Sequence, residues 1–215
     1  DTLLTGSKYL IYDLSSLFSS SENLTLAEKG HNADHLFLKQ VNFALFFAAD
    51  KKLPVMLKPM PGSVRDIKAL KAALAEFDIS SSITILDRGF SSNTIPELLR
   101  EKNVKFIIPL KRNSRLINYT LKKNQSFIYR NRGIHWTRTR VRGAFLYVYE
   151  DVKLRAEEET TFIGMLTDGQ RTQTGVERER ARFGTIALLS NIKEDGETVY
   201  LLLKEREDVE LAFDA

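Results

Sequence analysis

Short apolar runs recur along the first half of the chain, and polar turns or helix-like stretches separate them. Runs of this length that are rich in β-branched and aromatic residues are typical of buried strands. They cover residues 8–12, 41–49, 55–58, 82–86 and 104–110. Apolar positions spaced by three and four predict one helix at 63–77 and another that begins near Asn93. This alternation of strands and helices predicts an α/β fold.

The pattern changes after Leu110. Three aromatic or β-branched runs with near-alternation predict short antiparallel strands at 127–129, 135–141 and 144–149. Gly133 and Gly143 are the expected separators of these strands. The charged stretch 157–182 shows no clear period. The α/β alternation therefore stops, and a β-rich segment begins.

The end of the chain returns to the first pattern, with a predicted strand at 184–192 and a helix at 198–213. We therefore expect a core formed by residues 1–110 and 184–215, with residues 111–183 inserted into it. A mixed sheet flanked by helices is the expected architecture of this core.

Charge is distributed unevenly along the chain, which has a net charge of +4. From Lys111 to Arg142 there are ten basic residues and no acidic ones, which leaves 22 basic residues against 28 acidic ones elsewhere. A basic block on an otherwise acidic chain is typical of a surface that binds a polyanion. The alternative is a basic face that only contacts solvent.

Composition excludes several classes of protein. The absence of cysteine excludes a disulfide-bonded scaffold, thiolate zinc sites, iron–sulfur clusters and thiol catalysis. The longest apolar runs, such as 43–49, are far shorter than the roughly 20 residues of a membrane span. No signal segment opens the chain, and its first residue is Asp1, as expected of a fragment of a longer protein.

Two acidic residues directly follow predicted strands, Asp13 after 8–12 and Asp87 after 82–86. Open α/β sheets build their sites at this edge, although such acids also form turns and cap helices. Glu210 on the last helix is a candidate third carboxylate. Three convergent carboxylates form an oxygen site suited to two Mg²⁺ or Mn²⁺ ions, which activate a nucleophile for phosphodiester cleavage.

Four short motifs occur in a specific order. They are Tyr12-Asp13-Leu14-Ser15, Pro61-Gly62-Ser63-Val64-Arg65-Asp66, Ile85-Leu86-Asp87-Arg88-Gly89-Phe90 and Leu203…Arg206…Glu210. Asp87 follows Asp13 by 74 positions, and Glu210 follows Asp87 by 123. In order and spacing the chain resembles the DDE transposases of prokaryotic insertion sequences, in the branch with a Y-R-E-K box and a β-rich insertion.

The resemblance implies a ribonuclease-H-like catalytic domain that uses Asp13, Asp87 and Glu210 as metal ligands and catalytic residues. It implies Mg²⁺-dependent cleavage of DNA at the inverted-repeat ends of a transposon, followed by attack of the freed 3′-hydroxyl on target DNA. It further implies a homodimer in a synaptic complex. This complex would act on nucleoid DNA in the prokaryotic cytoplasm, and no membrane would be involved. Arg206 would then contact a DNA phosphate; the alternative is a surface salt bridge with Glu210.

The expected DNA-binding side chains come from the last helix, the turn after Asp87 and the basic block. They are Arg206, Arg88, Lys111, Arg112, Trp136, Arg138, Arg140 and Arg142. Trp136 has two interpretations, stacking on an unpaired base or packing in a core. Asp66 is expected to support the site or, alternatively, to stabilise the first turn of its helix. We interpret His31 and His35 as loop residues rather than metal ligands.

Two positions depart from the family pattern. Leu203 stands where the box has tyrosine, and the box lysine would fall two residues beyond Ala215. Two alternatives to a transposase therefore stay open. One is a ribonuclease-H-like nuclease without strand transfer, and the other is a truncated, inactive relative that only binds DNA.

Overall fold

The computed structural model describes residues 6–31, 36, 38–92, 94–169 and 176–213, with side chains as far as Arg206. The chain divides into two compact units. The first comprises Asp1–Ile108 and Leu201–Ala215, and the second comprises Pro109–Tyr200. Residues 184–200 thus group with the second unit, whereas the predicted core includes them. The functional division into core and insertion stays a prediction.

The first unit contains a mixed sheet in the order β4-β3-β1-β5-β6. Its strands are β1 (Tyr9–Phe18), β3 (Lys39–Ala48), β4 (Leu53–Pro61), β5 (Ile83–Ile85) and β6 (Lys105–Pro109), and the two-residue β2 (Glu28–Lys29) pairs with the start of β3. The first three long strands form an antiparallel meander, and β5 and β6 run parallel to β1. This order is that of a ribonuclease-H-like sheet, so the predicted fold class is confirmed.

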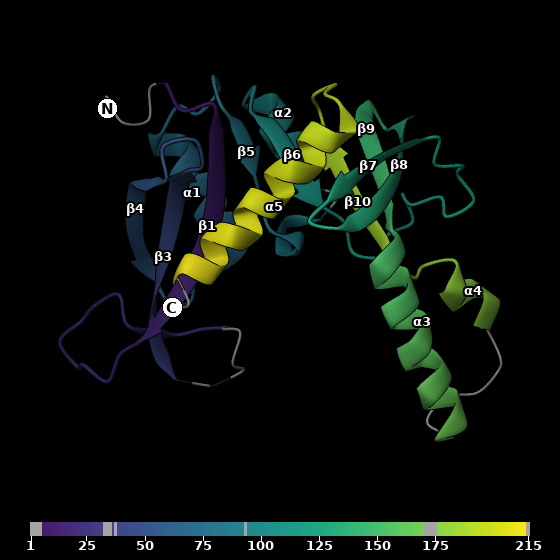
Figure 1. The fold of residues 1–215 in the computed structure, drawn as a ribbon. Helices are drawn as coiled ribbons and strands as arrows, with labels where there is room; N and C mark the ends of the chain where they lie inside the picture. The colour runs from purple at the N-terminus through teal and green to yellow at the C-terminus, as the bar shows by residue number, and fades with distance from the viewer. Residues whose placement is uncertain (1–5, 32–35, 37, 93, 170–175, 214–215) are drawn as a thin grey trace. The chain divides into compact units, whose positions relative to one another are not determined.

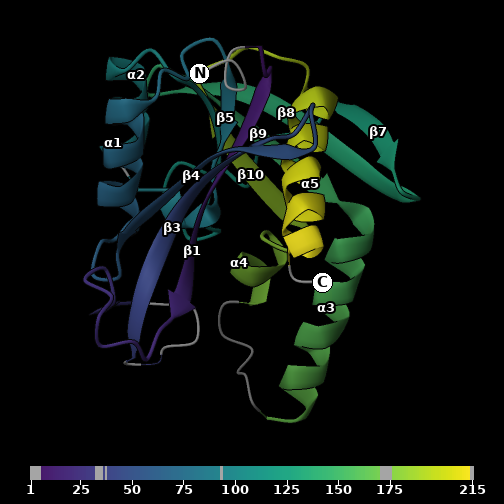
Figure 2. The ribbon, with the colours of Figure 1, turned by 90° about the vertical axis from the view of Figure 1, so that its left-hand side faces the viewer.

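Helices flank this sheet on both faces. Helices α1 (Asp66–Glu76) and α2 (Thr94–Glu101) cover one face, and the part of α5 (Gly196–Phe213) that belongs to this unit lies on the other (Figures 1 and 2). Helix α1 buries Ala69, Leu70, Ala73 and Leu74 along one side. Because α1 presents an apolar stripe and the sheet presents apolar residues on its face, their packing forms a core.

Strand β4 is longer than predicted, because its prolines do not end it. Pro59 and Pro61 lie inside β4 and pair in register with Phe43 and Val41 of β3. Proline lacks the N–H that a second neighbouring strand would need, so it is tolerated where only one side of a strand is paired. The predicted strand 55–58 is therefore the centre of an edge strand of nine residues.

The second unit contains an antiparallel sheet in the order β10-β9-β8-β7. Its strands are β7 (Gln125–Tyr129), β8 (Arg132–Val141), β9 (Ala144–Asp151) and β10 (Thr185–Ser190). The predicted antiparallel strands are thus present. Gly143 lies in the β8–β9 turn as expected, whereas Gly133 lies within β8.

The β7–β8 turn instead uses Arg130 and Asn131, which have φ angles of 46° and 60°. Two-residue hairpin turns with positive φ match the twist of the flanking strands, and asparagine tolerates this conformation better than most residues. The sequence signal for this turn was therefore Asn131 rather than the nearby glycine.

The charged stretch without a clear period is largely helical. It contains most of α3 (Val152–Thr167) and α4 (Val176–Arg180). Asp151 caps α3, since its carboxylate accepts a hydrogen bond from the N–H of Leu154 at 2.9 Å. None of the α3 side chains is fully buried. A helix without a buried stripe gives no apolar period in sequence, which explains why it was not predicted.

Aromatic side chains form the core of the second unit. Trp136 stacks on Tyr147 with ring centres 6.3 Å apart, and the rings of Tyr149 and Tyr200 lie 5.2 Å apart. The hydroxyl of Tyr149 donates to the carbonyl of Gly196 at 2.8 Å, and burial raises the pKa of this tyrosine well above its usual value. A methyl group on Gly196 would overlap the indole ring of Trp136. Only glycine therefore fits where α5 begins.

We expect Gly196→Ala to destabilise the protein by about 1–3 kcal/mol, because the added methyl group forces the tightly packed Trp136 to shift. The matched control is Gly164→Ala in α3, where an added methyl group meets no atom within 4 Å. This control should stabilise the protein by about 0.5–1 kcal/mol through higher helix propensity. Urea denaturation measures both changes, and equal stabilities of the two variants would contradict the packing.

Candidate active site

Asp13 and Asp87 follow a matched pair of residues on two neighbouring parallel strands, although Asp13 lies inside β1 and Asp87 lies just beyond the end of β5. Ile11 of β1 pairs with Ile85 of β5, and each aspartate lies two residues beyond its member of this pair. Residues two apart on a strand point to the same face, and neighbouring strands lie about 4.8 Å apart. The register therefore places the two predicted carboxylates at one level and on one face of the sheet, where β5 ends.

Asp87 is held by two contacts. Its Oδ2 accepts a hydrogen bond from the N–H of Gly89 at 3.1 Å, which closes the turn of the short helix η1 (Arg88–Phe90). Its Oδ1 lies 3.3 Å from Nη2 of Arg206 on α5. The guanidinium of Arg206 is nearly buried, whereas the Asp87 side chain is 43% exposed. The carboxylate is thus oriented by protein contacts and remains accessible to solvent.

Asp13 is half-buried, and its Oδ2 accepts a hydrogen bond from the hydroxyl of Ser15 at 2.8 Å. The preceding residue, Tyr12, points to the opposite face and is fully buried against Phe90. Its hydroxyl has no hydrogen-bond partner among the described residues. Burial raises the pKa of Tyr12, and the nearby charges of Asp66 and Asp13 raise it further. Tyr12 is therefore uncharged at neutral pH and packs on the face of the sheet opposite Asp13.

Asp66 is the first residue of α1 and lies close to the Asp87 turn. A methyl group placed on Gly89 would lie 3.3 Å from Oδ2 of Asp87 and 3.8 Å from Oδ2 of Asp66. Both carboxylates therefore flank the same glycine. This placement suits the expected supporting role of Asp66, and the residue also lies in the helix turn where an acid stabilises the dipole.

Two buried amides that the sequence reading missed position the turn before Asp66. Asn42 of β3 donates from Nδ2 to the carbonyls of Gly62 and Val64, at 3.1 and 2.8 Å. Gln40 donates from Nε2 to Oδ1 of Asn42 at 2.9 Å. Buried polar groups need hydrogen-bond partners. The sequence signal for these contacts was the presence of two amide side chains within and beside the apolar run 41–49. A cavity of about 480 Å³, partly lined by Asn42 and Asp66, lies beside this turn.

The third predicted carboxylate, Glu210, belongs to α5, but its side chain lies outside the described residues. Among the side chains that the structure describes, no three acidic, histidine or cysteine residues gather as metal ligands. The carboxylates of Asp13 and Asp87 offer hard oxygens of the kind that fits Mg²⁺ or Mn²⁺. Leu203, which stands at the tyrosine position of the box, is buried. His35, interpreted from the sequence as a loop residue, lies outside the described residues.

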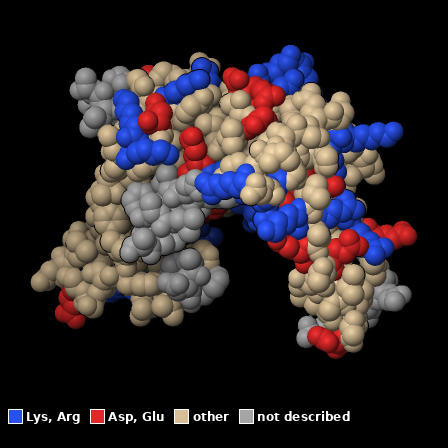
Figure 3. Space-filling model, in the orientation of Figure 1, with Lys and Arg blue, Asp and Glu red and all other residues tan. Residues whose placement is uncertain are grey.

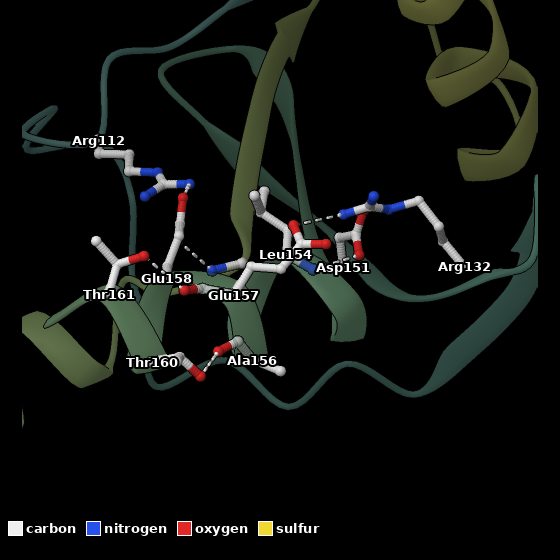
Figure 4. A network of polar contacts seen from close by, with 10 residues as sticks. Arg112, Arg132, Asp151, Leu154, Ala156, Glu157, Glu158, Thr160 and Thr161 are labelled. Carbon is white, nitrogen blue, oxygen red and sulfur yellow. Dashed lines mark hydrogen bonds and ion pairs between the residues drawn. The ribbon is translucent and has the colours of Figure 1, made fainter. Parts of the chain in front are cut away.

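Acidic side chains of α3 neutralise part of the basic block (Figure 4). The guanidinium of Arg112 donates to Oε1 of Glu158 at 2.7 Å. Arg132 pairs with the buried Asp151 at 2.6 Å and with Glu157 at 3.6 Å. The basic block therefore does not form one uniform cationic surface, because some of its charge stabilises the second unit.

Three other arginines of the basic block, Arg138, Arg140 and Arg142, belong to the β8–β9 hairpin. Arg138 lies over the ring of Tyr147, with 5.8 Å to its centre, and donates to the carbonyl of Glu194 at 2.7 Å. Arg140 lies over Phe145 at 5.4 Å and is exposed. Arg142 is exposed in the turn at the tip. In cation–π contacts of this kind the guanidinium itself lies over the ring, so the contacts orient the charged groups of Arg138 and Arg140.

Trp136 lies on the same face of β8 as these arginines but is only 5% exposed. Its indole ring packs against Tyr147, Tyr149 and Gly196. The structure thus agrees with the interpretation of Trp136 as a residue that packs in a core. By contrast, Lys111 and Arg88 are exposed. Figure 3 shows that basic and acidic side chains intermingle over much of the visible face.

Comparison with known proteins supports a family assignment. Residues 15–215 match the family described as Transposase DDE domain. The match includes Asp87, Arg206 and Glu210 and begins two residues after Asp13. No curated protein matches the chain. Among the helices in the described part of the chain, none has the length and apolar character needed to cross a bilayer. Because the family match covers most of the chain, the protein belongs to the transposase DDE domain family, whose members are DNA-processing enzymes.

Proposed function

We propose that this chain is the catalytic domain of a DNA transposase from a prokaryotic insertion sequence, in the branch with a Y-R-E-K box. The observation that carries the proposal is the register of β1 and β5, which puts Asp13 and Asp87 each two residues after the pair Ile11 and Ile85. Arg206 on α5 adds a basic group beside Asp87. The family match supports this assignment.

The proposed reaction has two steps at one site. Water attacks a phosphorus atom at the end of the element, and the P–O3′ bond breaks to leave a 3′-hydroxyl. This hydroxyl then attacks a target phosphodiester, which forms a new P–O bond and releases a target 3′-oxygen. Two Mg²⁺ ions bound by Asp13, Asp87 and Glu210 would activate the nucleophile and stabilise the leaving oxygen.

The protein side chains bind and orient the DNA in this proposal. Arg206 would contact the phosphate next to the cleaved bond, where a guanidinium forms paired hydrogen bonds with two oxygens. Arg88, Lys111, Arg140 and Arg142 are exposed and would contact the backbone elsewhere. The substrates would be the inverted-repeat ends and target DNA, bound by a homodimer in a synaptic complex at the prokaryotic nucleoid.

One observation favours a second candidate, an inactive relative that only binds DNA. Leu203 occupies the tyrosine position of the box and is buried, so this position offers no hydroxyl to a phosphate. The carboxylates of Asp13 and Asp87 are unaffected by this change. A measurement of cleavage and joining distinguishes the two candidates, and a plain nuclease would cut DNA without joining it.

We expect Asp13→Asn and Asp87→Asn in the full-length protein to lower Mg²⁺-dependent DNA cleavage on the order of 10³-fold or more, the scale of losing one essential catalytic group. The matched control is Glu101→Gln, which removes an exposed carboxylate at the end of α2. Cleavage and joining are measured with a 3′-end oligonucleotide of the element and a supercoiled target. The transposase proposal is contradicted if either aspartate variant cuts DNA as well as the wild type does. It is also contradicted if the wild type and the control both fail to join DNA ends to the target.

We expect the double change Arg140→Ala/Arg142→Ala to weaken DNA binding and flatten its salt dependence. Each lost phosphate contact lowers the slope of log K against log salt by about 0.9, so the pair should lower it by roughly 1.8. The matched control is Arg180→Ala, since Arg180 pairs with Glu159 at 2.9 Å. Fluorescence anisotropy at several salt concentrations measures the slopes. An unchanged slope in the double variant would rule out these contacts.

A further inference from the structure

Arg206 and Asp87 form an ion pair whose members differ in exposure. Nη2 of Arg206 lies 3.3 Å from Oδ1 of Asp87, and Arg206 is 7% exposed as a residue. A guanidinium that is removed from water needs nearby negative charge to offset its lost hydration. Asp87 supplies negative charge at this position. The stability of the buried arginine is therefore linked to a candidate catalytic carboxylate.

The two oxygens of Asp87 have different neighbours. Oδ2 accepts the hydrogen bond from Gly89, so Oδ1 is the oxygen that faces Arg206. A divalent cation bound to Oδ1 would stand within a few ångströms of the guanidinium. Like charges at such separations repel, and the nearly buried guanidinium is screened by water less than an exposed one. A metal ion on Oδ1 would therefore compete with Arg206 for this oxygen.

We propose that Arg206 is a positioning residue that occupies Asp87 until a DNA phosphate draws its guanidinium away, so that metal and DNA bind cooperatively. This inference rests on the proposed function, in which Asp87 binds metal and Arg206 contacts phosphate. A phosphate offers the guanidinium two acceptor oxygens in matching geometry. Transfer of Arg206 from carboxylate to phosphate removes a positive charge from Oδ1. Linkage then requires that metal strengthens DNA binding by the same factor.

The first experiment measures Mn²⁺ binding to the full-length protein without DNA, by calorimetry. Arg206→Met keeps the apolar stem and removes the charge, so Mn²⁺ affinity should rise by about five-fold or more, the lower end of typical coupling between sites. The matched control is Lys105→Met. Lys105 is exposed and pairs with Ile83, the first residue of β5, whereas Asp87 follows the other end of this strand. Its removal should leave Mn²⁺ affinity unchanged, and equal or weaker binding by Arg206→Met overturns the proposal.

A second measurement needs no substitution at Arg206 and so does not depend on whether that variant folds. Binding of a short DNA duplex to the wild-type protein is compared in Ca²⁺ and in Na⁺ at equal ionic strength. We expect tighter binding in Ca²⁺ for the wild type and no such difference for Asp87→Asn. Equal binding by the wild type in both salts overturns the cooperative link.

The outcomes separate this inference from the proposed function. If Asp87→Asn binds Mn²⁺ as tightly as the wild type, the metal site and the proposed function both fail. If Asp87→Asn loses Mn²⁺ binding while Arg206→Met gains none, the proposed function stands and only the competition by Arg206 fails.

Discussion

The parallel register between β1 and β5 is the constraint on which the candidate site depends. The pairing of Ile11 with Ile85 fixes the register of the two strands, and each aspartate follows its member of this pair by two positions. A slip of one residue in β5 would turn Asp87 to the opposite face, because side chains alternate along a strand. Burial opposes such a slip. Tyr12 and Leu86 are both fully buried and occupy the positions just before the aspartates.

The same groups serve both the stability and the proposed chemistry of the first unit. Asp87 caps the η1 turn through Gly89 and also faces the nearly buried Arg206. Asp66 lies at the start of α1 and beside that same turn. Polar groups in such a place are tolerated because each offsets the charge or hydrogen-bonding need of another. A change at one of these residues therefore alters the electrostatic environment of the others.

In the second unit, charge that is separated in sequence is paired in space. The basic block from Lys111 to Arg142 contains no acid, yet Arg112 and Arg132 contact carboxylates of α3 (Figure 4). The exposed basic residues that remain are spread along the block, and two of them, Arg140 and Arg142, lie at the β8–β9 turn. A run of like charges thus overstated the cationic surface, because tertiary contacts bring acids from a later segment to it.

The sequence by itself determined the α/β class, most strands of both units and the position of Asp87 just after a strand, because these features depend on local apolar patterns and chain order. Asp13, predicted to follow a strand that ends at residue 12, instead lies inside β1, which continues to Phe18 because it stays paired with β3. The role of Glu210 stays a prediction. Only the tertiary structure decided the pairing of Asp87 with Arg206, the burial of Trp136 and the amide contacts that place the turn before Asp66. The amide contacts of Asn42 span 20 and 22 positions, and the pair of Asp87 with Arg206 spans 119. No local pattern encodes such contacts, since they form only when burial and register bring distant segments together.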